Sequence, residues 1–486
     1  MDVDELKQVR MDKLNNLKEL GISPYGNKFE RTHYVADLLA DFIEEATVVV
    51  AGRVMANRKH GKVMFLDLQD QTGRIQLFVK KDNLGEEKFA VLKELDIGDI
   101  IGASGETFTT KMGQESIRAK EITILSKSLN PLPEKFHGLK DVDLRYRQRY
   151  VDLIINNDVR DVFIKRSKIT SLIRNYLDSD GFLEVETPML QTMAGGARGR
   201  PFKSQHNAYD LDVFLRIAPE LYLKRLLVGG LERVYEMNRN FRNEGVSTRH
   251  NPEFTMMEVY QAYGNVDDMM SLTENLISYL AKEITGSFKV SYQGKEIDFT
   301  TPWERRSFAQ VVKDKFDIDP EDDAAAMLVK VKKVRSNVNI DTLTKTAIMN
   351  IVEEALEEDD ILNPVFFTDY FTFLCPLAKT RPDNKFISER FEVFIAGMEI
   401  GNAYSELNDP QEQRARLLED LGEDLETGNR TIDEDFVNAL EYGMPPAGGL
   451  GIGIDRLVML LTDSASIRDV ILFPLMKPIV QEQDEE

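Results

Sequence analysis

Residues 241–254 read FRNEGVSTRHNPEF and lie between two runs of alternating apolar and polar residues, 232–237 and 254–260. Such alternation is typical of half-buried strands, and the glycine and the Asn-Pro pair inside the stretch favour turns. We therefore predict a hairpin with a long loop. In this loop Arg242 can bind a phosphate or a carboxylate through two hydrogen bonds, and Phe254 offers a ring face on which a base can stack. A solvated, charged hairpin tip explains the same pattern, so this stretch alone leaves both interpretations open.

The composition limits the class of protein. A length of 486 residues predicts two or three domains, and a net charge of −22 argues against a chain that coats nucleic acid nonspecifically. Residues 46–130 nevertheless hold 13 Lys and Arg against 11 Asp and Glu, so a nucleic-acid partner remains open for this part. The single cysteine, Cys375, excludes an internal disulfide framework, and the five histidines show no zinc-site spacing.

Two further expectations come from the same counts. No apolar run reaches the length of a membrane span, and the first five residues are acidic where a secretory leader would be basic. We therefore expect no membrane partner and a cytoplasmic location. A metal ion, if one is used, should be a hard cation that is held by carboxylates.

The N-terminal third has the pattern of a small β-barrel. Residues 1–20 carry apolar side chains at helical spacing, which predicts a surface helix. Five short strands and a helical stretch at 86–95 then match a closed barrel of the oligonucleotide-binding (OB) type; the predicted strands are 48–54, 63–68, 74–79, 100–105 and 121–125. Exposed Phe65, Gln76 and Phe78 would stack on and bind unpaired bases. The alternative is that both phenylalanines belong to the barrel core.

A stiff segment, Asn130-Pro131-Leu132-Pro133, is the best candidate for a domain boundary. We predict an N-terminal helical extension (1–45), the barrel (46–130), a linker (131–150) and a larger domain (151–486) with a helical insertion at about 264–364. Within the larger domain the same patterns predict helices at 161–180 and 219–227, strands at 182–188 and 390–406, and a glycine-rich loop at 195–199. The final block, 448–460, has strand-like glycines next to an apolar helix that begins with Asp455-Arg456.

Three segments of this domain, taken in order, resemble the signature motifs of class II aminoacyl-tRNA synthetases. They are 181–188 (GFLEVETP), 241–254, and 449–456 (GLGIGIDR). The barrel narrows the resemblance to the subgroup that charges aspartate, asparagine and lysine. Within this subgroup, residues 216–224 (RIAPELYLK) and 399–408 (EIGNAYSELN) are similar to the lysyl-tRNA synthetases of bacterial type.

The resemblance implies an α+β fold, with an N-terminal OB-fold barrel and a class II catalytic domain whose antiparallel sheet is flanked by helices. It also implies a homodimer. The implied reaction activates L-lysine with ATP and Mg²⁺ to lysyl-adenylate, and then transfers lysine to the 3′ end of tRNA(Lys), with release of AMP and pyrophosphate.

The resemblance also assigns roles to individual residues. Arg242 and Arg456 would be the catalytic cations, and Glu392 and Glu399 would hold Mg²⁺ on the triphosphate. The implied ATP-binding residues are Arg242, Glu244, His250, Asn251, Phe254, Glu392, Glu399 and Arg456. The implied lysine-binding residues are Gly196, Glu220, Arg242, Glu258, Tyr260, Asn402, Tyr404 and Glu406. The barrel would read the anticodon through Phe65, Gln76 and Phe78.

Physical chemistry suits these roles. Lysine carries two ammonium groups at the ends of an apolar chain, so its pocket must supply two separated anions with an apolar or aromatic wall between them. An aspartate pocket should instead place a cation against the substrate side chain, and no cation replaces Glu406 in this sequence. Three alternatives stay open here: an aspartyl- or asparaginyl-tRNA synthetase, a tRNA-independent paralogue, and a regulatory RNA-binding protein with an inactive synthetase domain.

Overall fold

The computed structural model describes residues 3–133, 141–193, 195–197, 199–335, 344–357, 361–422 and 432–479, with the backbone alone at 354–357. Part of the predicted linker, 134–140, lies outside the described residues. The chain divides into two compact units, Met1–Lys140 and Asp141–Glu486.

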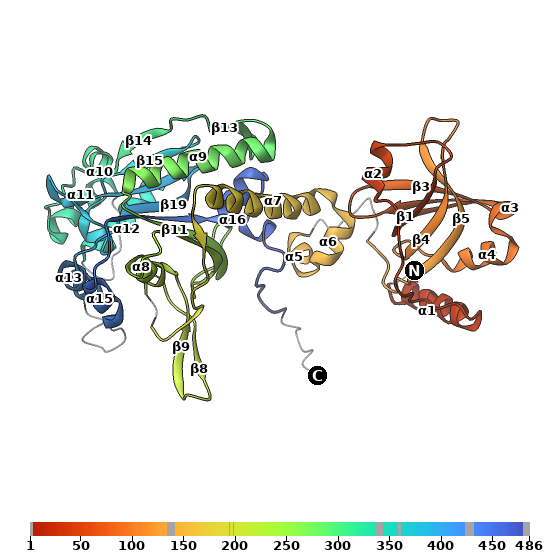
Figure 1. Cartoon of the computed structure of the whole chain (residues 1–486), viewed down its shortest axis with the longest axis horizontal. Helices are drawn as coiled ribbons and strands as arrows, with labels where there is room; N and C mark the ends of the chain where they lie inside the picture. Colours follow the sequence, from red (N-terminus) through yellow and green to blue (C-terminus); the bar gives the residue numbers. More distant parts are fainter. Residues whose placement is uncertain are drawn as a thin grey trace. The chain divides into compact units, whose positions relative to one another are not determined.

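The N-terminal unit is a closed barrel whose strands follow the order β1-β2-β3-β5-β4 (Figure 1). All five predicted strands are present, and each extends beyond its predicted range. Alternate residues of these strands point inward and form one apolar core. The strands are β1 (Thr47–His60), β2 (Val63–Gln69), β3 (Arg74–Lys80), β4 (Ile100–Thr109) and β5 (Glu115–Ser126), and the helices are α1 (Val3–Glu19), α2 (Val35–Ala40), α3 (Lys81–Leu84), α4 (Glu86–Val91) and η1 (Leu92–Glu94).

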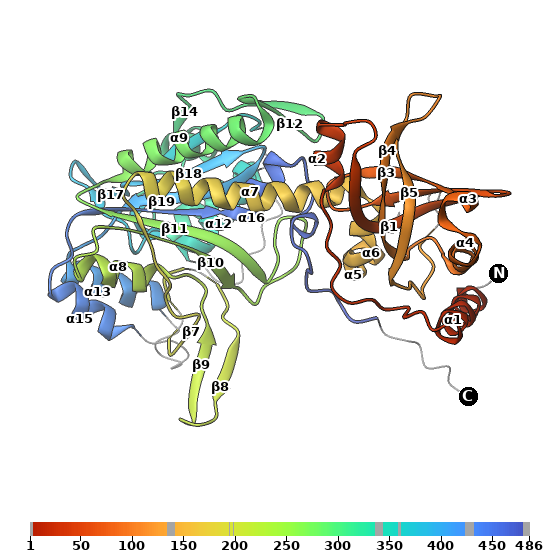
Figure 2. The same ribbon diagram turned by 45° about the vertical axis from the view of Figure 1, so that its right-hand side comes forward.

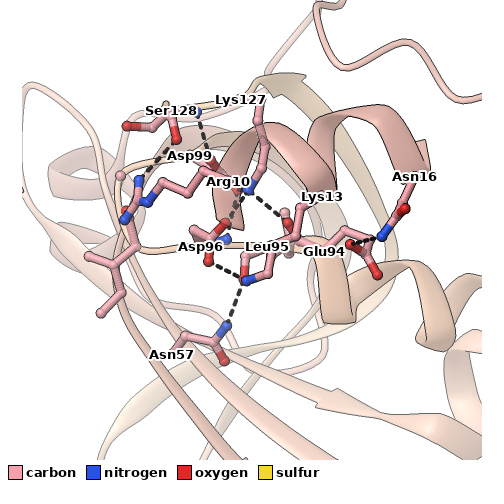
Figure 3. Close-up of polar contacts among 12 residues, drawn as sticks. Arg10, Lys13, Asn16, Asn57, Glu94, Leu95, Asp96, Asp99, Lys127 and Ser128 are labelled. Atoms are coloured by element: carbon pink, nitrogen blue, oxygen red, sulfur yellow. Dashed lines mark hydrogen bonds and ion pairs between the residues drawn. The ribbon is translucent and has the colours of Figure 1, made fainter. Parts of the chain in front are cut away.

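Helix α1 is bound to the barrel by a buried network of charged groups (Figure 3). Lys127 and Asp99 are fully buried, and their Nζ and Oδ2 atoms are 2.8 Å apart. Asp96 accepts from both Lys127 and Lys13 of α1. Arg10, also on α1, donates to the carbonyl oxygens of Ile97, Ser128 and Asn130. The helix is therefore part of the barrel unit.

The second unit is built on an eight-stranded sheet (Figure 1). We predicted an antiparallel sheet, and the structure has a mixed one, because the pairs β14–β15 and β10–β6 are parallel. The predicted hairpin is present as β10 and β11, in register from Phe241 opposite Glu253. In order across the sheet the strands are β14 (Glu304–Ser307), β15 (Val365–Thr368), β18 (Arg390–Ile395), β19 (Met398–Ser405), β20 (Ala447–Gly453), β11 (Glu253–Ala262), β10 (Arg233–Phe241) and β6 (Leu183–Glu184).

Helices cover both faces of this sheet. On one face α7 (Asn157–Ser179), α9 (Val266–Thr285) and α16 (Ile454–Leu461) complete the main apolar core with the strands (Figure 1). This core includes Trp303, the single tryptophan of the chain, whose ring stacks on Phe366 with centroids 5.4 Å apart. On the other face α8 (Glu220–Val228) and α15 (Glu434–Glu441) pack against residues of β10 and β11 that alternate with the core residues.

The segment predicted as a helical insertion, at about 264–364, also contributes to the central sheet and its core. Its first helix, α9, is buried against the central sheet, and β14 is an edge strand of that sheet. A second apolar cluster holds the helices after β14. They are α10 (Phe308–Phe316), α11 (Ala324–Val334) and α12 (Lys345–Glu357).

Smaller elements surround the sheet. Strands β7, β9 and β8 form a three-stranded sheet, and the β8–β9 hairpin projects from the unit (Figure 2). The remaining strands are β7 (Leu190–Gln191), β8 (Lys203–His206), β9 (Leu211–Leu215), β12 (Lys289–Tyr292), β13 (Lys295–Asp298), β16 (Thr380–Arg381) and β17 (Asn384–Ser388). The remaining helices are α5 (Val142–Arg147), α6 (Arg149–Ile155), α13 (Pro410–Leu421), η2 (Thr372–Leu374) and η3 (Ile467–Asp469). Among the described residues no helix is long and apolar enough to span a bilayer.

We predict that Lys127→Met destabilises the barrel by about 3 kcal/mol, because it leaves the fully buried Asp99 without its cation and Asp96 with Lys13 alone. Amides that exchange through barrel unfolding should then exchange roughly 100-fold faster in hydrogen-exchange mass spectrometry. Lys88→Met is the matched control, since Lys88 and Glu121 form an exposed pair. Equal exchange in the two variants would show that the buried pair is not needed for stability.

Candidate active site

The site lies on the face of the central sheet that bears α8, where two rows of residues cross strands β11, β20 and β19. Tyr260, Gly449 and Tyr404 are paired in one row. The next row contains Glu258, Gly451 and Asn402 in the same order of strands. Because β20 contributes glycines to both rows, the large side chains of its two neighbours share the space above it.

Gly449 has the tightest surroundings of these glycines. A Cβ at this position would lie 1.8 Å from Oε1 of Glu406 and 2.6 Å from the ring of Tyr260. Real Cβ atoms do not approach neighbours so closely. The missing side chain of Gly449 is therefore what allows the Glu406 carboxylate and the Tyr260 ring to lie where they do.

Two cavities open on this face, and they share two residues. The first has a volume of about 490 Å³ and is lined by Gly196, Glu220 and Tyr404, among others. The second has a volume of about 190 Å³. Arg242 and Asn402 line both cavities. The Arg242 Nε atom is buried without a hydrogen-bond partner among the described residues, so this guanidinium has an unused donor where the cavities meet.

A cluster of buried acids lies beside the first cavity. Glu220 is 5% exposed and accepts from the Tyr404 hydroxyl at 2.5 Å. Glu258 is also 5% exposed and accepts from the Tyr260 hydroxyl at 3.0 Å. Glu406 is 1% exposed. Glu258, Tyr260 and Glu406 are not among the residues that line the cavity.

One buried cation accompanies these three acids. The Nζ atom of Lys224 on α8 is 2.8 Å from Glu220 and 2.5 Å from Glu406. Burial raises the pKa of Glu406 to about 8, although Lys224 opposes the shift. Burial and the charge of Glu220 raise the pKa of Glu258 to about 8 as well. The cluster thus carries more acid groups than Lys224 can neutralise.

The second cavity contains cationic and aromatic groups. Phe254 lies beneath Arg242, whose guanidinium carbon is 5.2 Å from the ring centroid. Arg456 approaches His250 with Nη2 and Nε2 3.1 Å apart and donates to the carbonyl oxygen of Glu399. Burial and the Arg456 charge lower the pKa of His250, so its imidazole is neutral at pH 7. Glu244, Asn251 and Glu399 also line this cavity.

The position of Arg456 is fixed by the residue before it. Asp455 is buried and accepts from the backbone N–H of Thr255 on β11 and from Arg166 on α7, both at 2.6 Å. One carboxylate therefore ties together three elements at the start of α16. Arg456 follows on the side of the second cavity.

Glu392 and Glu399 lie on adjoining antiparallel strands, β18 and β19. Glu392 accepts from the Tyr370 hydroxyl at 2.7 Å and forms an ion pair with Arg390. Burial, and then the charge of Glu399, raise the pKa of Glu392 to about 8, although Arg390 opposes the shift. The two carboxylates thus influence each other. Glu399 lines the second cavity, and Glu392 lines neither.

The barrel carries a separate row of aromatic rings on its outer surface. Phe65 and Phe78 are half-buried, are not part of the barrel core, and have ring centroids 5.4 Å apart. Phe108 continues the row 5.7 Å from Phe78, and the Arg118 guanidinium lies 4.8 Å over the Phe108 ring. The expectation that Gln76 is exposed is wrong: it is buried between β2 and β5, where the Ser116 hydroxyl donates to it.

Sequence reasoning missed four residues of these sites. Lys224 lies four residues after Glu220, a spacing that places both on one face of a helix and that pointed to an ion pair. Phe108 and Arg118 lie in β4 and β5, and only the barrel closure brings them beside Phe78. The need for glycine at position 449 depends on β19 and β11, which are distant in sequence.

Comparison with known proteins agrees with this geometry. The family model described as tRNA synthetases class II (D, K and N) matches residues 141–477, and the model described as OB-fold nucleic acid binding domain matches residues 48–125. A lysine–tRNA ligase from Pelotomaculum thermopropionicum is 54% identical to this chain over 98% of it and 96% of the relative. The chain belongs to the lysine–tRNA ligase family. Other family members, from Syntrophomonas wolfei and Carboxydothermus hydrogenoformans, are each 51% identical over 98% of this chain and 98% and 99% of their own lengths.

We predict that Gly449→Ala raises KM for the amino acid in pyrophosphate exchange roughly 100-fold, because the new Cβ displaces the Glu406 carboxylate and the Tyr260 ring. ATP binding, measured by calorimetry, should not change, since Gly449 does not line the second cavity. A variant that unfolds at a much lower temperature, or that loses ATP binding as well, would contradict this local role.

Proposed function

We propose that the two joined cavities hold L-lysine and ATP, and that the chain uses them to make lysyl-adenylate and then lysyl-tRNA(Lys). The sharing of Arg242 and Asn402 by the two cavities carries this proposal. Amino-acid activation requires one point where a carboxylate meets the α-phosphate of ATP. An arginine with a free donor at the junction is suited to that point.

The reaction has two steps. A carboxylate oxygen of lysine attacks the α-phosphorus of ATP, and pyrophosphate leaves. A ribose hydroxyl of the terminal tRNA nucleotide then attacks the acyl carbon, and AMP leaves. Negative charge accumulates on the phosphate in the first step, and the preorganised Arg242 guanidinium stabilises it; Asn402 orients the lysine carboxylate. No protein nucleophile is required.

ATP would occupy the second cavity. Phe254, which lines this cavity, would offer its ring face to the adenine. Glu244 would accept from the adenine amino group. His250, Asn251 and Arg456 would contact the phosphates, and the neutral imidazole would do so as a hydrogen-bond donor.

Lysine would occupy the first cavity, with its ammonium groups toward the acid cluster. Glu220 and the backbone of Gly196 would bind the α-ammonium group, and Tyr404 would contact the methylenes. Glu406, Tyr260 and Glu258 would receive the side-chain ammonium group. An aspartate side chain would meet these same carboxylates and be repelled, whereas an uncharged side chain would leave Glu406 buried without a cationic ligand.

Glu392 and Glu399 would hold Mg²⁺. The charge of Glu399 raises the pKa of Glu392, and a pair of carboxylates that repel each other in this way fits a site for a divalent cation. Among the described residues no group of three or more His, Cys, Asp or Glu side chains is placed to hold a metal ion, so oxygen atoms of ATP would complete the coordination. When bound, Mg²⁺ would neutralise the triphosphate and favour departure of pyrophosphate.

Two surface features suit binding partners: the aromatic row of the barrel suits tRNA, and exposed apolar residues suit a second copy of the chain. The aromatic row of the barrel would stack on anticodon bases of tRNA(Lys). Gln76 is buried and bonded to Ser116, so we do not assign it a base contact. A homodimer would cover the sheet edge at β6, where Leu183 is 51% exposed, and Ile164 of α7, which is 55% exposed. Because tRNA is the substrate, we place the enzyme in the cytoplasm.

Pyrophosphate exchange with each of the twenty amino acids tests the proposed function. We expect exchange with lysine and little with aspartate or asparagine. Glu406→Gln should raise KM for lysine roughly 30-fold and leave KM for ATP unchanged, because it removes a charge-assisted buried contact worth about 2 kcal/mol. Exchange that depends on another amino acid, or an unchanged KM for lysine in the variant, would refute the assignment.

We predict that Phe65→Ala with Phe78→Ala raises KM for tRNA roughly 30-fold and spares pyrophosphate exchange, since a base–aromatic stack contributes about 1–3 kcal/mol. Phe29→Ala is the matched control: Phe29 is also half-buried in the barrel unit but packs against Gly102, outside the aromatic row. If the control impairs tRNA charging equally, the effect reports barrel stability and not stacking.

A further inference from the structure

Lys224 is a fully buried cation that the proposed reaction does not use. Its side chain is 0% exposed, and its Nζ atom bridges Oε1 of Glu220 and Oε2 of Glu406. The ring centroids of Tyr404 and Phe436 are 5.4 and 6.0 Å from the same Nζ. A lysine that only packed would not need both carboxylates and two aromatic faces. The ammonium group is instead held at one defined point.

The excess of buried acids in the pocket explains why Lys224 is needed there. Glu220, Glu258 and Glu406 are buried acids, and Lys224 supplies one positive charge. Nearby Arg216 and Glu236 neutralise each other at 2.6 Å, so they do not change the balance. When all three carboxylates are ionised, they and the one ammonium leave two negative charges. A ligand with two ammonium groups brings the sum to zero.

We propose that Lys224 is a positioning residue for lysine recognition, which holds Glu220 and Glu406 as an anionic pair so that a ligand with two ammonium groups completes the neutralisation of the pocket. This inference rests on the proposed binding of lysine in the first cavity. It concerns a residue that touches the acids and not the reacting atoms.

The Glu406 carboxylate can still accept hydrogen bonds from a ligand while Lys224 is beside it. Neither oxygen of Glu406 accepts a well-aligned hydrogen bond from any described residue, although Lys224 is its ion-pair partner. The carboxylate therefore has acceptor capacity left for a ligand. The groups that face it are Lys224 and Glu220 from α8, Glu258 and Tyr260 from β11, and Tyr404 from β19, which ends at the residue before Glu406. Among these groups only Lys224 favours the ionised form of Glu406.

The role has a consequence for pH. The pKa of Glu406 is about 8 with Lys224 beside it, so below this pH the incoming ammonium group must displace a proton. Lysine binding should therefore strengthen as the pH rises toward 8. Without Lys224 the pKa of Glu406 rises further, and the pH at which binding strengthens moves upward.

The first test is Lys224→Met, which keeps the stem and removes the charge. We expect KM for lysine in pyrophosphate exchange to rise roughly 30-fold at about pH 7, to recover in part above pH 8, and KM for ATP to stay within about twofold. Lys282→Met is the matched control, because Lys282 is exposed on α9 and also faces an aromatic ring, that of Phe288. The control should match the wild type.

The second test separates charge from packing. In Lys224→Ala, added n-propylammonium should lower KM for lysine, because it replaces the missing atoms and their charge, whereas neutral n-propanol should not. An unchanged KM in Lys224→Met, rescue by both additives, or equal rises in both KM values with a lowered unfolding temperature would overturn the proposal. Absence of lysine-dependent exchange in the wild type would instead refute the proposed function.

Discussion

The active site depends on one steric constraint, the absence of side chains along the middle of β20. Glycines at 449 and 451 leave a groove between β11 and β19, and the acids and aromatic rings of those strands fill it. On the opposite face of the same three strands, apolar residues such as Val259, Ala403 and Leu450 belong to the main core with α9 and α16. Strand alternation thus lets one short glycine-rich strand serve the core on one face and the site on the other.

The groove also brings together groups that repel one another. Burying several carboxylates is unfavourable, and the raised pKa values of Glu258 and Glu406 express that cost. The fold offsets part of it with Lys224 and with the hydroxyl groups of two tyrosines. A site of this kind gains most from a cationic ligand, which links the packing of the sheet to substrate choice.

Local pattern predicted much of the fold. Alternation identified the barrel strands and the β10–β11 hairpin, and the ordered motifs brought Arg242, Phe254 and Arg456 to one site. The failures involve contacts between distant segments. Gln76 was expected to be exposed, but its neighbours on β2 and β5 cover it. Likewise, helix α9 has the amphipathic pattern of any surface helix, and only the sheet assembly shows that it completes the core.

The single tryptophan has a spectroscopic consequence. Trp303 is 5% exposed in the core of the catalytic unit, where its ring stacks on Phe366 and its Nε1 donates to the carbonyl oxygen of Phe299. The barrel unit contains no tryptophan. Intrinsic fluorescence excited at the red edge of the absorption band therefore observes the catalytic unit alone. Unfolding of the barrel alone therefore leaves the tryptophan fluorescence unchanged. A fluorescence melting curve would report the unfolding of the catalytic unit and not that of the barrel.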